Sequence, residues 1–274
     1  MLKAQVQHYW DRQPCGTQFT DLPWGTAEFF AEVERFRYSV QPFMHRLIGF
    51  QHYAGKRVLE VGCGLGTDLV QFARAGARVT GIDLSPRSIE LTRQRFALEG
   101  LPGTFLVADA EQLPFEAESF EVVYSFGVLH HTPDIARAIA EIHRVLVPGG
   151  ELILMLYHRH SLHVWLGTPL YVAEQLHRQH RLRGARLLWQ TARELLQNGS
   201  RWQAEWVRVY DGAENPLGRA FSRSELRRLL HDFRTVHFRL CDPIRRRFPG
   251  WVNRVNQFIV APVAGFFVLA RAFK

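Results

Sequence analysis

The sequence is poor in cysteine, lacks a hydrophobic run long enough to cross a membrane, and has no apolar core near its first residue. Its three cysteines among 274 residues are odd in number and far apart, so they give neither a disulfide framework nor a zinc-type pairing. Residues 1–8 do not form a signal-peptide core. The longest apolar run, residues 258–270, contains Pro262 and Gly265 and is too short to span a bilayer. We therefore expect a cytoplasmic protein.

Acidic residues are scarce in the second half of the chain. Residues 1–150 have 14 basic and 17 acidic side chains, whereas residues 151–274 have 20 basic and 9 acidic ones. Such an excess of positive charge fits a solvated surface, contact with an anionic membrane, or binding of nucleic acid. The length fits one large α/β domain with additions.

Three alternating glycines stand out in the first half of the chain. Residues 58–61 form a short, mostly apolar run that includes Glu60. Gly62, Gly64 and Gly66 follow, and apolar residues then recur at helical spacing over residues 68–75. This order predicts a strand, a tight turn and a helix. Glycine lets a ligand lie against bare main chain, and the first N–H groups of the helix point at the same place.

The charges around this turn favour one kind of nucleoside. Asp83 ends a second apolar run, where a carboxylate can accept hydrogen bonds from ribose hydroxyls. A dinucleotide fingerprint needs a third glycine where this chain has Thr67 or Leu69. Glu60 and Asp68 flank the turn and would repel a diphosphate, whereas S-adenosylmethionine is a net cation. A nicotinamide-dependent Rossmann oxidoreductase and a turn without a ligand remain the alternatives.

Strand-like and helix-like segments alternate after the turn. We expect strands at residues 104–108, 120–125 and 151–157, and helices at residues 85–100 and 133–146. This alternation predicts a doubly wound parallel sheet that binds its ligand at the carboxyl ends of the strands.

Two helices are expected before the first strand, at residues 26–39 and 42–53, whereas residues 1–24 are expected to be irregular. A capping box at residues 222–225 predicts a helix that ends near residue 233. Strands are expected after it at residues 235–241 and 265–273.

The ordered motifs between residues 55 and 158 resemble those of class I S-adenosylmethionine-dependent methyltransferases of the ubiquinone/menaquinone type, the methyltransferase type 11 branch. They are Glu60-Val-Gly-Cys-Gly-Leu-Gly66, Gly81-Ile-Asp-Leu-Ser85, Ala108-Asp-Ala110, Leu113-Pro-Phe115, Ser119-Phe-Glu-Val-Val-Tyr-Ser125, Val128-Leu-His-His131 and Arg144-Val-Leu-Val-Pro-Gly-Gly150. The resemblance implies an α/β, doubly wound, seven-stranded Rossmann-like sheet. It also divides the chain into an N-terminal helical cap (1–54), a cofactor-binding core (55–158), an α-helical lid insertion after the fifth strand (159–221), and the end of the core with an antiparallel strand pair (222–274).

The resemblance also implies which residues bind S-adenosylmethionine. The glycine turn would hold its methionine part, Asp83 its ribose, and Asp109 the exocyclic amine of its adenine. Leu84 would pack on the adenine, the main chain of Ala110 would contact the ring, and the strand end at Ser125 would line the methionine end. The full set is Glu60, Gly62, Gly64, Gly66, Asp83, Leu84, Asp109, Ala110 and Ser125.

Three histidines are candidates for the chemistry of the acceptor. Methyl transfer from a sulfonium is an in-line displacement, so a base is needed only when the acceptor must lose a proton. His130, His131 and His158 follow strand ends and titrate in the right range, although each also fits a loop residue bonded to main chain. The spacing of His158, His160 and His163 lacks a carboxylate or cysteine partner, so we predict no metal site there.

The acceptor is expected to be a small or lipid-like organic molecule. The strand that ends at Ser125 continues with Phe-Gly-Val, which differs from the signature of base-amino methylases, so we expect no nucleic acid. Residues 245–259 combine arginines with apolar residues at helical spacing, which fits a helix on an anionic membrane and equally a helix packed on the sheet. The sequence leaves the oligomeric state open.

Overall fold

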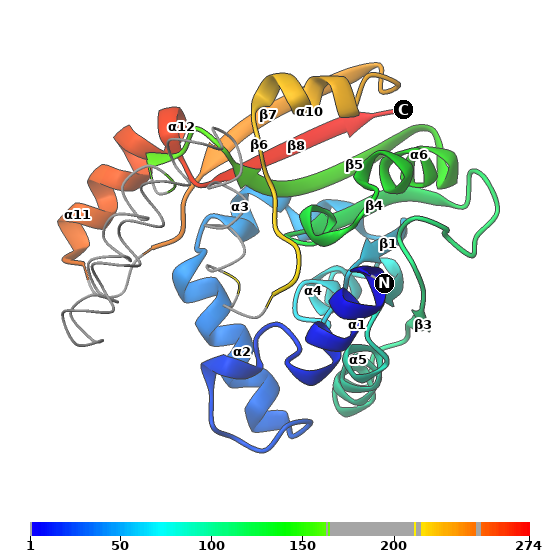
Figure 1. The fold of residues 1–274 in the computed structure, drawn as a ribbon. Helices are drawn as coiled ribbons and strands as arrows, with labels where there is room; N and C mark the ends of the chain where they lie inside the picture. Colours follow the sequence, from blue (N-terminus) through cyan, green and yellow to red (C-terminus); the bar gives the residue numbers. More distant parts are fainter. Residues whose placement is uncertain (1, 163, 165–210, 212–214, 245–247) are drawn as a thin grey trace.

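A computed structural model describes residues 2–162, 164, 211, 215–244 and 248–274 (Figure 1). Its centre is one sheet with the strand order β3-β2-β1-β4-β5-β8-β7. Strand β8 runs antiparallel to both of its neighbours, and the other pairs along this path are parallel. The seven-stranded, mostly parallel sheet predicted from the sequence is thus confirmed, with one short extra strand, β6, paired to β5. The bounds are β1 Arg57–Val61, β2 Arg78–Asp83, β3 Thr104–Val107, β4 Phe120–Phe126, β5 Leu146–His158, β6 Ala220–Phe221, β7 Thr235–Cys241 and β8 Phe267–Phe273.

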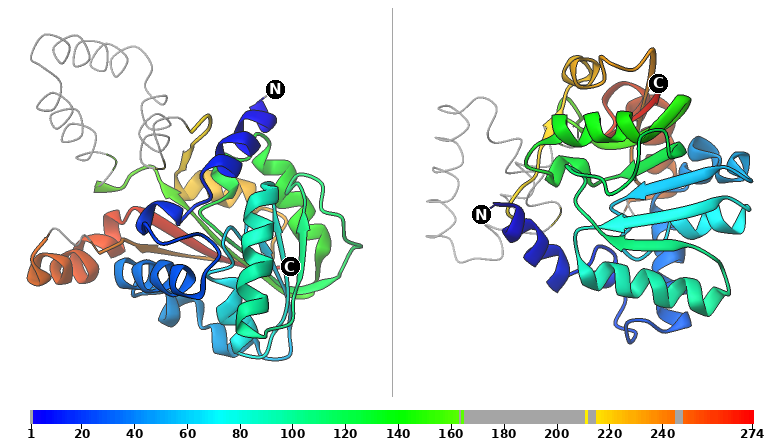
Figure 2. Two further views of the ribbon diagram at one scale, coloured as in Figure 1. Left: turned by 90° about the horizontal axis from the view of Figure 1, so that it is seen from below. Right: turned by 90° about the vertical axis from the view of Figure 1, so that its right-hand side faces the viewer.

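Helices cover both faces of the sheet, as the views in Figure 2 show. One buried apolar cluster joins the sheet to α3, α4 and α5, and a second joins its other face to α6 and α10. Because both faces are buried, the central strands β1, β4 and β5 are mostly apolar, as expected for a parallel sheet. The bounds are α3 Met44–Ile48, α4 Leu69–Arg74, α5 Pro86–Glu99, α6 Ile135–Val145 and α10 Arg223–Leu229. The predicted capping box is present, since the Ser222 side chain accepts from the Glu225 N–H and the Glu225 carboxylate accepts from the Ser222 N–H.

Two local predictions for the N-terminal cap are wrong. Residues 2–12 form a helix, α1 Leu2–Arg12, although the sequence predicted irregular structure. Val6 is the only buried residue of α1. The helix is held mainly by polar contacts, so its sequence lacks the apolar periodicity from which a helix is predicted. The helix predicted over residues 42–53 breaks at Gly49, whose φ of 69° ends α3 and starts a 3-10 turn, Phe50–Tyr53. The other cap helix, α2 Ala27–Val40, agrees with its prediction.

The predicted lid insertion and the segment predicted to contact a membrane are described to different extents. Most of the predicted lid insertion, residues 165–210 and 212–214, lies outside the described residues. After residue 247 the chain forms α11 Gly250–Val255, a π-helical turn Asn256–Val260 and α12 Ala261–Ala264. None of the helices in the described part of the chain is long and apolar enough to cross a membrane.

Candidate functional site

A cavity of about 480 Å³ lies at the carboxyl ends of β1, β2 and β4. This is the rim where a doubly wound sheet binds its ligand. Seven of the nine predicted cofactor residues line it, namely Glu60, Gly62, Gly64, Asp83, Leu84, Asp109 and Ala110. The structure therefore brings together residues that lie up to fifty positions apart in the sequence.

The glycine turn and Asp83 are joined by main-chain hydrogen bonds. The Gly64 N–H donates to Asp83 Oδ2 and the Ser85 N–H donates to Asp83 Oδ1, each over 2.9 Å. Burial raises the pKa of Asp83, and these N–H groups act in the opposite direction. Each carboxylate oxygen keeps a lone pair, so Asp83 can accept further hydrogen bonds from a ligand in the cavity.

Position 62 requires glycine for two reasons, the left-handed backbone conformation and the closeness of the Val128 side chain. Its φ is 78°, and a Cβ placed on it would lie 2.4 Å from the methyl carbons of Val128. Gly62→Ala should therefore lose about 1–2 kcal/mol to the left-handed backbone and about 1–3 kcal/mol to overpacking. Gly55→Ala is the matched control, because Gly55 has φ 75° and nothing within 4 Å of a built Cβ. Urea denaturation measures the free energy of unfolding of both variants. Equal losses of this free energy would mean that Val128 does not crowd position 62.

Glu60 places a buried carboxyl group in the cavity wall. Its side chain is buried, and Oε2 has no hydrogen-bond partner among the described residues. The nearby Asp68 is compensated, since Arg37 binds both of its oxygens and the hydroxyls of Tyr38 and Tyr124 donate to it. Burial and the charge of Asp68 together raise the pKa of Glu60 well above its ordinary value. A cationic ligand beside Glu60 would stabilise the ionised form of this carboxyl group and would be bound by it in turn.

Helix α1 contributes Lys3, Val6 and Trp10 to the lining of the cavity. It packs against α5 (Figure 2). The Lys3 ammonium lies 2.5 Å from carboxylate oxygens of both Asp109 and Glu111. The Gln7 side chain donates to the Leu84 carbonyl over 3.0 Å. Sequence reasoning missed α1 as part of the site, because these contacts are polar and come from residues without apolar spacing.

Two predicted cofactor residues do not line the cavity. The Ser125 hydroxyl points across the sheet and donates to the Val61 carbonyl over 3.0 Å. Gly66 faces α5, where a built Cβ would lie 3.0 Å from the Thr92 side chain. Both residues support the turn from behind and do not face a ligand.

The three candidate histidines have different surroundings. His158 is buried away from the cavity with Nδ1 3.2 Å from the Gly265 carbonyl, and burial lowers its pKa to about 4. His130 is fully buried behind the cavity wall, and burial followed by the nearby His131 lowers its pKa to about 4. Only His131 lines the cavity.

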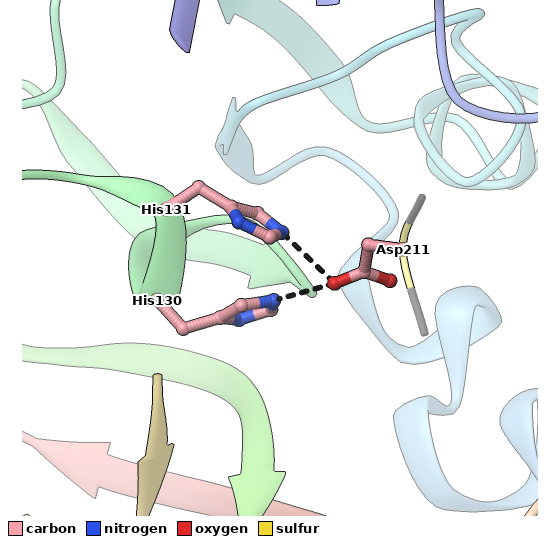
Figure 3. Close-up of side chains that lie close together, drawn as sticks. All are labelled: His130, His131 and Asp211. Carbon is pink, nitrogen blue, oxygen red and sulfur yellow. Dashed lines mark ion pairs between the residues drawn. The ribbon is translucent and has the colours of Figure 1, made fainter. Parts of the chain in front are cut away.

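His130 and His131 lie in a 3-10 turn, Leu129–His131, and both face Asp211 (Figure 3). Asp211 Oδ2 is 3.2 Å from His131 Nε2 and 3.6 Å from His130 Nε2. Tyr157 donates its hydroxyl to Asp211 Oδ1 over 2.6 Å. Burial alone would raise the pKa of Asp211, but the two histidines hold it well below its usual range. No spacing in the sequence points to Asp211, because it follows His131 by eighty positions.

Part of the chain that forms the site is similar to known proteins. Residues 59–154 match the family model described as "Methyltransferase domain". The chain is 44% identical over 110 residues to a phthiotriol/phenolphthiotriol dimycocerosates methyltransferase of Mycobacterium leprae, which covers 39% of this chain and 40% of that one. It is 35% identical over 98 residues to a sterol 4-C-methyltransferase of Caenorhabditis elegans, over 35% of this chain and 29% of that one. The chain thus matches less than half the length of these relatives.

Solved structures agree on the fold. An S-adenosylmethionine-dependent methyltransferase of Methanosarcina mazei aligns with a TM-score of 0.55 at 23% identity, over 81% of this chain and 95% of that one. One from Mesorhizobium loti aligns with a TM-score of 0.54 at 21% identity, over 81% and 92% of the two chains.

Proposed function

We propose that this chain, whose residues 59–154 are a methyltransferase domain, transfers a methyl group from S-adenosylmethionine to a small or lipid-like organic acceptor. The buried carboxyl group of Glu60 beside the glycine turn carries the proposal, because its Oε2 has no hydrogen-bond partner among the described residues. S-adenosylmethionine has a sulfonium and an ammonium against one carboxylate, so it suits this wall. The diphosphate of a nicotinamide cofactor would meet the charges of Glu60 and Asp83 instead.

The residues of the cavity fit the parts of this cofactor. Glu60 and the main chain of Gly62 and Gly64 would hold the methionine part, with Glu60 facing its ammonium. Asp83 would accept from the ribose hydroxyls, and Asp109 from the exocyclic amine of adenine. The remaining predicted contacts are Leu84 on the adenine face and the main chain of Ala110 at the ring. Bound S-adenosylmethionine supplies an activated methyl group, so the chain mainly fixes the distance and direction of the acceptor, which is worth about 7–11 kcal/mol.

A lipid-like acceptor is supported by the apolar part of the cavity. Its lining includes Phe36, Val40, Phe126, Met155 and Phe267. The polar end of the lining has Tyr157, His131 and Asp211, which would suit one oxygen-bearing group on an otherwise apolar molecule. The relatives named above are by name methyltransferases of a dimycocerosate lipid and of a sterol.

Transfer of label tests this function. The purified chain is incubated with methyl-labelled S-adenosylmethionine and with either the organic or the aqueous fraction of a cell extract. We expect label in products of the organic fraction, and roughly ten- to hundredfold less of it with Asp83→Ala when S-adenosylmethionine is far below saturation. Label that enters only the aqueous fraction would contradict the lipid-like acceptor, and label in neither fraction would contradict methyl transfer.

The helical segment after residue 248 supports peripheral contact with an anionic membrane as part of this function. Trp251, Phe258, Ile259 and Val263 are 67%, 74%, 66% and 76% exposed. Arg254 lies in the same segment, and the cavity lining includes Pro243 and Ile244 just before it. Arg245, Arg246 and Arg247 lie outside the described residues and add positive charge in the sequence. A lipid-like acceptor would then reach the cavity from the bilayer surface.

We expect the chain to sediment with anionic liposomes at low salt and to be released by high salt, since the Debye length is about 8 Å at physiological ionic strength. Trp251→Ser with Phe258→Ser should lower partitioning at least tenfold, because each buried apolar side chain contributes roughly 1.5–3 kcal/mol. Leu98→Ser is the matched control, as Leu98 is 55% exposed on α5. Wild-type protein that stays in the supernatant would exclude the membrane contact.

A further inference from the structure

The cluster of His130, His131 and Asp211 contains polar atoms that face one another without hydrogen bonds (Figure 3). Both ring nitrogens of His130 and Oδ2 of Asp211 are buried and have no hydrogen-bond partner among the described residues. An unsatisfied buried polar atom costs about 1–3 kcal/mol, so three in one place require an explanation. A positive ion between His130 Nε2 and Asp211 Oδ2 would satisfy these two atoms.

The orientation of His131 argues against a simple histidine base. Its Nδ1 lies 2.5 Å from the Leu217 carbonyl, and a nitrogen and an oxygen at this distance need a proton between them. The Asn215 amide nitrogen is farther from Nδ1, at 3.2 Å. Nδ1–H is therefore donated to Leu217, and the remaining nitrogen, Nε2, points at Asp211 Oδ2. A base would need this lone pair to face the acceptor.

The geometry matches the edges of a metal coordination sphere. Metal–ligand bonds of about 2.0–2.2 Å at tetrahedral angles place neighbouring ligand atoms roughly 3.3 Å apart. Asp211 Oδ2 lies 3.2 and 3.6 Å from the two Nε2 atoms, and one ligand atom of each residue falls within 4.8 Å of the others. Hydrogen bonds also fix the ligands from outside, as is usual at metal sites: His131 Nδ1–H donates to the Leu217 carbonyl, and the Tyr157 hydroxyl donates to Asp211.

We propose that His130 Nε2, His131 Nε2 and Asp211 Oδ2 bind one divalent transition-metal ion, with Zn²⁺ the best match to two imidazoles and one carboxylate. Three protein ligands leave a coordination position open. His131 and Asp211 line the cavity while His130 lies behind it, so the open position faces the cavity. The ligands come from two segments far apart in the sequence, so no local spacing predicts this site.

The ion's role follows from where it lies. An oxygen of the acceptor would fill the open position, and the ion would lower the pKa of a bound hydroxyl so that its proton passes to water. This role rests on the proposed function, whereas binding of the ion does not. Trp10 of α1, whose ring lies 5.2 Å from that of His131, would help to exclude other ligands.

Calorimetry with the metal alone tests the site. The untagged chain is stripped with EDTA, dialysed, and titrated with ZnCl₂ and separately with MgCl₂. We expect one equivalent of Zn²⁺ to bind in the micromolar range or tighter, and Mg²⁺, which prefers oxygen ligands, not to bind. His130→Gln and Asp211→Asn should each weaken Zn²⁺ binding by roughly a hundredfold or more, beyond the effect of losing an outer hydrogen bond.

His143→Gln is the matched control, because it removes an imidazole on α6 outside the cluster and should leave Zn²⁺ binding unchanged. X-ray absorption of the zinc-loaded wild type should show two imidazole ligands, and this reading does not depend on the variants folding. Wild-type protein without Zn²⁺ binding, or cluster variants that bind as the wild type does, would overturn the site. Binding of S-adenosylhomocysteine should be the same with and without EDTA, which separates this result from the test of methyl transfer.

Discussion

Asp83→Ala is expected to weaken binding of S-adenosylhomocysteine ten- to hundredfold. The substitution removes a charged acceptor of ribose hydroxyls, which is worth about 1.5–3 kcal/mol. It also frees the N–H groups of Gly64 and Ser85, so the glycine turn loses the group that fixes it. Equilibrium binding by calorimetry measures the loss.

The matched control is Asp232→Ala, because Asp232 is an exposed aspartate beyond α10 and far in sequence from the turn. Its affinity should equal that of the wild type. Asp83→Asn keeps one oxygen acceptor for the turn and should fall between wild type and Asp83→Ala. A folded Asp83→Ala protein with unchanged affinity would show that Asp83 does not bind the ribose.

Glu60→Gln is expected to move stability and affinity in opposite directions. In the free protein Glu60 is buried and its Oε2 has no hydrogen-bond partner among the described residues, so the neutral amide should raise the free energy of unfolding at pH 8 by about 1–3 kcal/mol. The same change removes the carboxylate that would face the ammonium of the cofactor. Binding of S-adenosylhomocysteine should therefore weaken roughly ten- to hundredfold.

The stability effect of Glu60→Gln should depend on pH. The pKa of Glu60 is raised on folding, so ionisation in the unfolded chain above about pH 4.3 favours unfolding. The wild type loses stability as the pH rises from that value towards the raised pKa, and the variant does not. The difference in melting temperature should therefore be small near pH 4 and larger at pH 8.

Glu121→Gln should change the melting temperature at pH 8 in the opposite direction. Glu121 lies on the neighbouring strand β4, where the Arg57 N–H and guanidinium lower its pKa. Its ionised form stabilises the fold, so Glu121→Gln should lower the melting temperature at pH 8. If Glu60→Gln also lowers it, Glu60 has a partner in solution and the charge argument for the cofactor fails.

Residues 55–158 could be predicted from the sequence because their signals are local. Strand runs, turn glycines and helix caps each act within a few residues, and Ser85 and Gly100 bound α5 as expected. Helix α1 could not be predicted, since Lys3 and Gln7 hold it through polar contacts with residues far along the chain. Gly49 ended a helix that apolar spacing alone would continue.

The candidate site shows the same difference between local signals, which could be predicted, and contacts between distant residues, which could not. A position at a strand end predicts the correct rim but not the direction of the side chain, so Ser125 and His158 were placed at the rim although both bond to main chain away from the cavity. Asp211 lies beside His131 although eighty positions separate them in the sequence. No spacing pattern predicts a contact between residues so far apart. Glu60 could be predicted because the turn it flanks is continuous in sequence.

The central claim is that the cavity binds S-adenosylmethionine. Calorimetry that compares the binding of S-adenosylhomocysteine with that of NADPH on the same preparation tests it most directly. The charge of Glu60, the glycine turn and the carboxylate of Asp83 predict that S-adenosylhomocysteine binds with one molecule per chain and that NADPH does not bind. Binding of NADPH without S-adenosylhomocysteine, or binding of neither, would contradict the assignment of this cavity to S-adenosylmethionine.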